Sequence, residues 1–308
     1  MRPSSLPALA LAFVAASCGA TTGTVSRDAP PVPPPAAAAP PPASPEEALP
    51  GVDLTGLSAY AKQSLATWAS ETFVACGLPL TVSGALRTHK GCKHAPRMVA
   101  LARGMAAKGA TGPEIKKLVD AYYAGFDRRA AFDLANMGEP LGDPKAKITL
   151  VVVSDFTCPF CKITVPAVEA FAKEHAAEVR LYAKPFPIAA HPGAQEAAEA
   201  GEWARDAGIY WEVQKRLYEL DEVPNPDNLA AVIEASGGDG ADLKEALAQG
   251  KYRGRVAAAQ GEGRRANLAH TPSLYMNGRL VDDLTAEGLR FALDDEREWV
   301  AHGGWLKD

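Results

Sequence analysis

Two cysteines separated by two residues, Cys158 and Cys161, have the type and spacing needed for chemistry on other thiols. They follow an apolar, β-branched run at 148–153 that predicts a buried strand, and they begin an amphipathic segment that predicts a helix. The unpaired N–H groups and the dipole of a helix N-terminus favour a thiolate, which is the species that attacks a disulfide. A second thiol close by can resolve the resulting mixed disulfide, so the pair predicts thiol–disulfide exchange.

Two other interpretations of the pair fit the chain less well. Two ordinary core cysteines would not need Pro159, which fixes the turn that follows Cys158. A zinc site would need two further ligands, and the chain contains no second Cys-x-x-Cys and no His-x-x-x-His pair. The sequence therefore predicts a redox site with no metal and no cofactor.

The segments that must position the pair alternate between strand and helix patterns after a turn at 138–147. The predicted elements are strand 148–153, helix 161–176, strand 179–184, helical segments 191–218, 226–235, 240–248 and 253–269, strands 273–276 and 279–281, and helix 285–300. Asn277-Gly278 between the last two strands is a strong hairpin signal. The predicted order is β-α-β, a helical insertion, and β-β-α.

This order resembles the DsbA-like branch of the thioredoxin superfamily over residues of about 138–302. The motifs that carry the resemblance are Phe156-Thr157-Cys158-Pro159-Phe160-Cys161 and His270-Thr271-Pro272-Ser273, with the helical insertion between them. The resemblance implies an α/β thioredoxin fold in which 138–308 form one domain, with an insertion at about 188–269.

The resemblance also implies roles for individual residues. Cys158 would be the nucleophile, Cys161 the buried resolving thiol, and Pro272 a cis proline that faces them. Taken alone, Pro272 also fits a simple proline at the start of a strand. Main-chain groups of Thr271 would hydrogen-bond an extended peptide substrate beside the thiols. The residues expected to bind substrate are Thr271, Pro272, Pro159 and Phe160.

Proton transfer at the site has no obvious carrier in the sequence. Members of the family usually have a buried acid six residues before the nucleophile, where this chain has Val152. Asp155 could serve weakly, but a solvated strand-end acid or an N-cap-like acid is the favoured interpretation. Lys162 could favour the thiolate by its charge, although a solvated lysine is the default. The lone histidines His191 and His270 could each approach the site, but packing or surface residues are the favoured interpretation.

Residues 53–137 show helical periodicity without convincing strands and predict a small all-α domain. Cys76 and Cys92 lie in its longest irregular connection, and in an exported protein they are best explained as a structural disulfide. The alternative is a zinc site formed by Cys76, His89, Cys92 and His94. The domain distantly resembles the helical domain of cytochrome c maturation proteins of the CcmH type. Because it lacks their Cys-x-x-Cys, we expect a scaffold or partner-binding module without haem chemistry.

Residues 1–17 predict a bacterial export signal, since Arg2 precedes a short apolar run and small residues lead to Cys18. The run at 15–19 resembles a lipobox, which implies that Cys18 is lipidated; ordinary cleavage or a free Cys18 is the alternative. The Pro/Ala-rich segment within 18–52 predicts an extended tether, either a spacer or a flexible linker. We therefore expect an exported, periplasmic protein that is attached to a bacterial membrane through its lipid.

The formal charge of −5 and the scattered Lys and Arg residues argue against a nucleic-acid partner. Together the predictions favour a periplasmic oxidoreductase that oxidises or shuffles disulfides of exported proteins or peptides and is recycled by a redox partner. Neither the Pro159-Phe160 dipeptide nor Thr271 decides the direction of electron flow. The alternative is an adaptor or a partner-specific reductase in cytochrome c maturation, which would recognise one partner through the helical domain.

Overall fold

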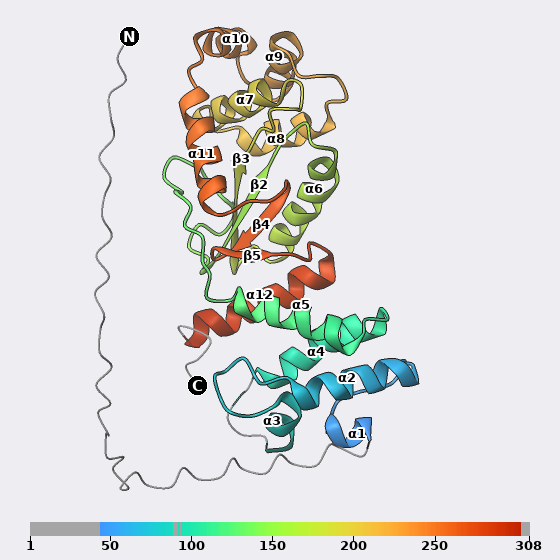
Figure 1. Ribbon diagram of the computed structural model, residues 1–308. Coiled ribbons are helices and arrows are strands. Elements are labelled where there is room, and N and C mark those ends of the chain that lie inside the picture. Colours follow the sequence, from blue (N-terminus) through green and yellow to red (C-terminus); the bar gives the residue numbers. More distant parts are fainter. Residues whose placement is uncertain (1–43, 89–91, 93, 303–308) are drawn as a thin grey trace, which may run out of the picture. The chain divides into compact units, whose positions relative to one another are not determined.

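The computed structural model describes residues 44–88, 92 and 94–302, and Figure 1 labels their helices and strands. The predicted export signal at 1–17, Cys18 and most of the tether predicted at 18–52 lie outside the described residues. Among the helices of the described part, none is both long and apolar enough to span a membrane.

The N-terminal part of the described chain is helical and has its own apolar core. Ser58 and Thr111 cap the second and fifth helices by accepting backbone hydrogen bonds, and Glu114 completes a capping box at the fifth. The helical core begins earlier than predicted, because Ala48 and Leu49, which lie within the predicted tether, already belong to it. The helices are α1 Pro45–Ala48, α2 Ala59–Glu71, α3 Val82–Thr88, α4 Ala95–Ala107 and α5 Gly112–Ala124.

A disulfide joins Cys76 and Cys92 in this helical part. It closes a loop that begins after α2, contains α3 and ends just before α4. Because both sulfurs are bonded to each other, the alternative zinc site is left without thiolate ligands. Another of its proposed ligands, His89, lies outside the described residues.

The C-terminal part is built on one sheet with the strand order β1-β3-β2-β4-β5. The strands are β1 Leu141–Gly142, β2 Ile148–Ser154, β3 Val179–Pro185, β4 Ser273–Met276 and β5 Arg279–Val281. β2 and β3 are parallel and joined by α6, Pro159–Glu174, whereas the other neighbouring strands are antiparallel. The remaining helices are α7 Ala194–Asp206, α8 Tyr210–Glu219, α9 Pro226–Ala235, α10 Gly240–Gln249, α11 Arg253–Arg265 and α12 Ala286–His302.

The predicted order of β-α-β, helical insertion and β-β-α is confirmed, with two differences in detail. β1 is an unpredicted edge strand of two residues, which is too short to show an alternating pattern. The helix predicted at 191–218 is two helices, α7 and α8. Gly208 lies between them with a φ of 73°, a left-handed conformation that ends the first helix.

β2 is buried along nearly all of its length because both faces of the sheet are covered. Val152 belongs to the main core, which includes side chains of α6, whereas Val153 faces the opposite side. On that side the Phe132 ring lies 4.8 Å from the Tyr275 ring. The connector at 127–137 thus packs on the sheet, and the helical core ends at Phe126, before the predicted domain boundary at 137.

The tip of the β4–β5 hairpin holds this connector in place. Asn277 and Gly278 have φ values of 48° and 81°, as a tight two-residue hairpin turn requires. The Gly278 carbonyl accepts a hydrogen bond from Ala130 N at 2.8 Å. A Cβ atom at Gly278 would lie 2.3 Å from the Ala130 oxygen, so only glycine fits this approach.

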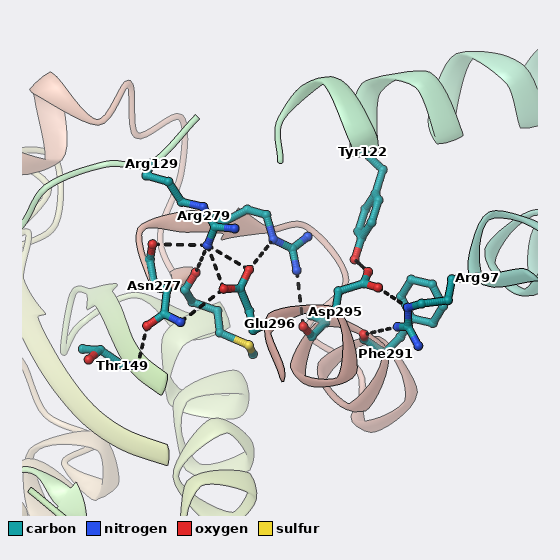
Figure 2. A network of polar contacts seen from close by, with 11 residues as sticks. Arg97, Tyr122, Arg129, Thr149, Asn277, Arg279, Phe291, Asp295 and Glu296 are labelled. Atoms are coloured by element: carbon teal, nitrogen blue, oxygen red, sulfur yellow. Dashed lines mark hydrogen bonds and ion pairs between the residues drawn. The ribbon is translucent and has the colours of Figure 1, made fainter. Parts of the chain in front are cut away.

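Side chains of the helical part, of the connector and of β5 meet two adjacent acids of α12, as Figure 2 shows. Glu296, whose side chain is 0% exposed, accepts hydrogen bonds from Arg129 at 2.7 Å and from Arg279 at 2.9 Å. Asn277 donates to the same carboxylate at 3.2 Å. We call the six residues the charge network: Arg97, Tyr122, Arg129, Arg279, Asp295 and Glu296.

Asp295 is the second acid of the charge network and is also fully buried. It binds Arg97 of α4 and the hydroxyl group of Tyr122 of α5. Burial raises the pKa of Asp295, and the charge and hydrogen bonds of Arg97, together with the Tyr122 hydroxyl, oppose that rise. Because α4 and α5 belong to the helical core and α12 follows the sheet, the network ties the two cores together.

Candidate active site

The two cysteines lie at the start of α6, just after the C-terminal end of β2. Cys158 is the residue before the first helical residue, Pro159, and Cys161 lies in the first turn with its side chain in the main core. Proline suits this first position because its φ is already helical and its missing N–H group would have no partner within the helix. Both cysteines are free thiols.

Cys158 is less accessible than expected for a nucleophile, since it is 4% exposed, whereas Cys161, which was expected to be the buried thiol, is 0% exposed. Cys158 Sγ lies 3.6 Å from the carbonyl oxygen of Thr271, to which its S–H group donates. Asp155 N donates to Cys161 Sγ at 3.5 Å. Burial raises the pKa of the Cys161 thiol to about 12, although the Asp155 N–H and the Thr271 hydroxyl favour the thiolate. Cys161 is therefore a thiol at neutral pH.

This arrangement predicts selective alkylation of the reduced protein. A thiol with a pKa of about 12 is ionised in roughly one molecule in ten thousand at pH 8, and iodoacetamide reacts with the thiolate. We expect native protein to be labelled at Cys158 alone at pH 8 and also at pH 9, because both values lie below the Cys161 pKa. Peptide mass mapping checks the site, and labelling in urea provides the control in which both thiols react. Equal labelling of the two thiols in the native protein would contradict the burial argument.

The loop before β4 lies against Cys158. The Thr271–Pro272 peptide bond is cis, as the resemblance implies. Thr271 is buried, with its carbonyl oxygen beside the Cys158 sulfur. Ser273 Oγ donates to the His270 carbonyl at 2.7 Å and closes the loop, while the His270 side chain is exposed. The chain segment that was expected to bind substrate is thus next to the thiol that was expected to react.

Asp155 is buried, at 2% exposure, so its interpretation as a solvated acid is wrong, whereas its side chain does accept a backbone N–H as an N-cap-like acid would. Its Oδ1 accepts hydrogen bonds from Thr157 N at 2.8 Å and Thr157 Oγ1 at 2.7 Å. Its Oδ2 accepts from Ile188 N at 2.9 Å and lies 2.8 Å from His191 Nδ1. The carboxylate therefore holds the residues before Cys158 to the chain that follows β3.

His191 is a site residue that the sequence does not identify. With Nδ1 beside a carboxylate, the neutral ring carries its proton on Nδ1 and presents Nε2 as a hydrogen-bond acceptor. The side chain is 29% exposed and lines a cavity of about 200 Å³ together with Thr157 and Pro159. The Asp155-x-Thr157 spacing is a local turn signal, but His191 lies 36 residues beyond Asp155 and has no local signal.

The cavity is part of a groove whose far wall is the connection between α8 and α9, including Val223. Lys162 spans the groove, because its Nζ donates to the Leu220 carbonyl; it is bound rather than freely solvated. Large apolar side chains beside the groove face solvent, with Phe160 71%, Ile163 76% and Val223 59% exposed. Several exposed apolar side chains beside a thiol pair indicate a contact surface for another molecule.

A protein-family model with the description Thioredoxin matches residues 135–295, just over half of the chain. The chain belongs to the thioredoxin family. The matched segment of the thioredoxin domain contains the whole sheet, the free thiol pair and the cis proline. The predicted fold class, a thioredoxin fold with a helical insertion behind a small all-α region, is therefore confirmed.

The chain also matches part of several curated membrane transporters. It is 32% identical over 139 residues to the Na(+)/H(+) antiporter NhaA 3 of Salinispora tropica and 31% identical over 139 residues to NhaA 1 of Salinispora arenicola. Each match covers 45% of this chain and 21% of the antiporter. The chain thus spans about a fifth of the length of these relatives.

Solved structures with a similar fold include a BdbD and a DsbA protein. BdbD from Bacillus subtilis, in its oxidised form, is 21% identical with a TM-score of 0.46, over 53% of this chain and 97% of that chain. DsbA from Chlamydia trachomatis is 18% identical with a TM-score of 0.49, over 56% of this chain and 96% of that chain. At these levels of identity the likeness is one of fold alone, and the roles of residues depend on the contacts described above.

The thioredoxin domain brings most of the predicted site residues together. Cys158 contacts Thr271, and Pro159 lines the groove beside them. Phe160 is exposed on the first turn of α6. Val152, at the position where the family usually has a buried acid, lies in the apolar core. The structure adds His191 and the buried Asp155 to this set, and it places the Cys76–Cys92 disulfide in the helical part.

Proposed function

We propose that the protein is a thiol–disulfide oxidoreductase that exchanges disulfides with exported proteins or peptides. The observation that carries the proposal is the free thiol pair at the start of α6, with Cys161 enclosed in the core and Cys158 beside the Thr271 carbonyl. This arrangement supplies one thiol to form a mixed disulfide and a second, protected thiol to resolve it. No metal or other cofactor is needed for the exchange.

In the proposed oxidising direction the reaction starts from a Cys158–Cys161 disulfide. A substrate thiolate attacks Cys158 Sγ, a mixed disulfide forms, and the bonding electron pair leaves on Cys161. Cys161 then takes up a proton, since its pKa is about 12. A second substrate thiolate attacks the substrate sulfur, so the substrate leaves as a disulfide and Cys158 as a thiolate. Two electrons remain on the pair, and a redox partner removes them.

The groove supplies binding and proton transfer in this proposal. The exposed Phe160, Ile163 and Val223 side chains offer apolar contact to an extended chain of little sequence preference. His191 Nε2 can accept the proton of a substrate thiol in the groove, and the Asp155 carboxylate stabilises the imidazolium that forms. The proposal also includes export to the periplasm, lipidation of Cys18 and oxidation or isomerisation as the physiological direction.

A second candidate function is that of an adaptor or a partner-specific reductase in cytochrome c maturation. The helical part is held to the thioredoxin domain by the charge network. It also exposes two aromatic side chains, Tyr60 at 58% and Phe73 at 63%. Exposed aromatic residues on a fixed module favour recognition of a particular partner.

Trapping of mixed disulfides tests the proposal and separates the two candidates. In a Cys161→Ser variant of the full chain, Cys158 keeps its ability to attack but the resolving thiol is lost. We expect this variant, expressed in a bacterial periplasm, to accumulate disulfide-linked adducts with several exported proteins on non-reducing gels. The Cys158→Ser, Cys161→Ser double variant is the matched control and should form none. A single trapped protein would favour the adaptor, and no adduct at all would overturn the oxidoreductase proposal.

A further inference from the structure

A second cavity lies away from the thiols, beside the β4–β5 hairpin. Its volume is about 460 Å³, and its walls come from the end of α5, the connector near Ala130, the C-terminal end of α11 and the hairpin. The hairpin tip pairs with the beginning of β2, since Asn277 N donates to Thr149 O at 2.7 Å, whereas Cys158 follows the end of that strand. The cavity is therefore separate from the groove of the candidate active site.

Arginine dominates the walls of this cavity, which we call the arginine pocket. Four guanidinium groups line it and face one carboxylate, that of Asp282. Because the whole chain has a formal charge of −5, such a concentration of positive charge is not a property of the surface in general. The four arginines are Arg128, Arg129, Arg265 and Arg279.

Two of these arginines are held rigidly at the inner side. Figure 2 shows Arg129 and Arg279 converging on the buried Glu296 carboxylate. The Arg129 guanidinium also stacks on the Trp299 ring, 4.1 Å from its centroid, and Arg279 lies 4.4 Å from the Phe126 centroid. Donor groups that are fixed in advance lose little conformational entropy when a ligand binds.

Some hydrogen-bond donors in and behind the pocket have no acceptor after these contacts are counted. Arg129 Nε and Nη2 are buried and bind no acceptor among the described residues. Buried donors of this kind are uncommon in native proteins and usually have a partner such as an ion or a water molecule. Arg128 and Arg265 are exposed, and neither forms an ion pair with another residue in the described ranges. Even with Glu296 and Asp282 counted against the four arginines, positive charge remains in excess.

We infer that the arginine pocket binds a small ligand that carries two or more oxyanion groups. A guanidinium group donates two parallel hydrogen bonds to a phosphate or a carboxylate, and several such groups around one cavity match a multivalent anion. The cavity volume falls within the range of small-molecule sites and is too small for a folded partner. Asn267 and Tyr275, which also line the pocket, add neutral hydrogen-bonding groups for the rest of the ligand.

Calorimetric titration of the full chain tests this inference. Pyrophosphate and citrate are the two probes, used separately at constant ionic strength, with sodium chloride as the non-specific control. We expect saturable binding of at least one probe and not of chloride. Pyrophosphate binding alone identifies a phosphate ligand, and citrate binding alone identifies a polycarboxylate. Absence of saturable binding for both probes would overturn the inference.

Substitutions at the rim locate the binding. Arg128→Gln and Arg265→Gln remove exposed guanidinium groups without disturbing the charge network, and each should weaken binding by roughly tenfold. Arg264→Gln is the matched control, because Arg264 is an exposed neighbour in α11 that does not line the pocket. Equal weakening by Arg264→Gln and Arg265→Gln would show binding by general surface charge and would overturn the assignment to this pocket.

Discussion

Replacement of Cys158 with serine should lower the rate of disulfide exchange by about a thousandfold or more. A serine hydroxyl is not ionised near neutral pH and forms no mixed disulfide, so every step of the proposed cycle is lost. The fold should be unaffected, because the hydrogen bond of Cys158 Sγ is to the Thr271 carbonyl, which a hydroxyl group can also reach. Oxidation of a reduced dithiol peptide and reduction of insulin both measure the effect.

The matched control for Cys158→Ser is Cys161→Ser. This variant should still form the first mixed disulfide in a single turnover and then stop, because the resolving thiol is absent. Cys158→Ser should change the free energy of unfolding by less than about 1 kcal/mol. Cys161→Ser places a hydroxyl group in the apolar core and should lower the free energy of unfolding by about 1–3 kcal/mol, which urea unfolding measures. Unchanged turnover in the Cys158→Ser variant would show that the thiol pair is not the reacting group.

Glu296→Ala should lower the free energy of unfolding by about 3–5 kcal/mol, the largest stability effect that we expect from one substitution. Glu296 is fully buried and binds both Arg129 and Arg279, so its removal leaves two guanidinium groups without their carboxylate. Asn277 at the hairpin tip loses the same partner. Urea unfolding followed by tryptophan fluorescence measures the change.

Glu287→Ala is the control for this prediction, since Glu287 is an exposed acid in the first turn of the same helix. It should cost less than about 1 kcal/mol. If Glu296→Ala cost no more than the control, the contacts of Glu296 with Arg129 and Arg279 would not stabilise the fold.

Local patterns account for the parts of the fold that the sequence predicts well. The apolar run of β2, the proline at the start of α6 and the Asn277-Gly278 turn each act within a few residues, and their positions could be read directly. The two-residue β1 could not be predicted, because it is defined by pairing with β3 and not by a pattern of its own. The domain boundary at 137 was misplaced for a similar reason, since Phe132 is ordered by a contact with Tyr275 far along the chain.

The sequence predicts only those site residues whose reactive side chains also lie close together along the chain. Cys158 and Cys161 can be recognised from their spacing in the sequence. The partners of Asp155, by contrast, are Ile188 and His191, which lie 33 and 36 residues further along the chain. The contacts of Arg97 and Tyr122 with Asp295 span 198 and 173 residues, and no sequence pattern reports such distances. Arginines that are scattered along the chain likewise meet in one pocket only after folding.

The short strand β4 has a consequence for the proposed adaptor role, in which a partner binds the helical part. It begins directly after Pro272, beside the thiol site, and ends directly before Asn277, whose side chain binds Glu296. Four residues of extended chain span roughly 13 Å. This strand therefore sets a fixed spacing between the reacting sulfur and the junction of the two cores. A partner held at that junction could react only through a cysteine that lies at this same distance from its bound surface. Substrates would then be selected by the position of their cysteine as well as by their sequence.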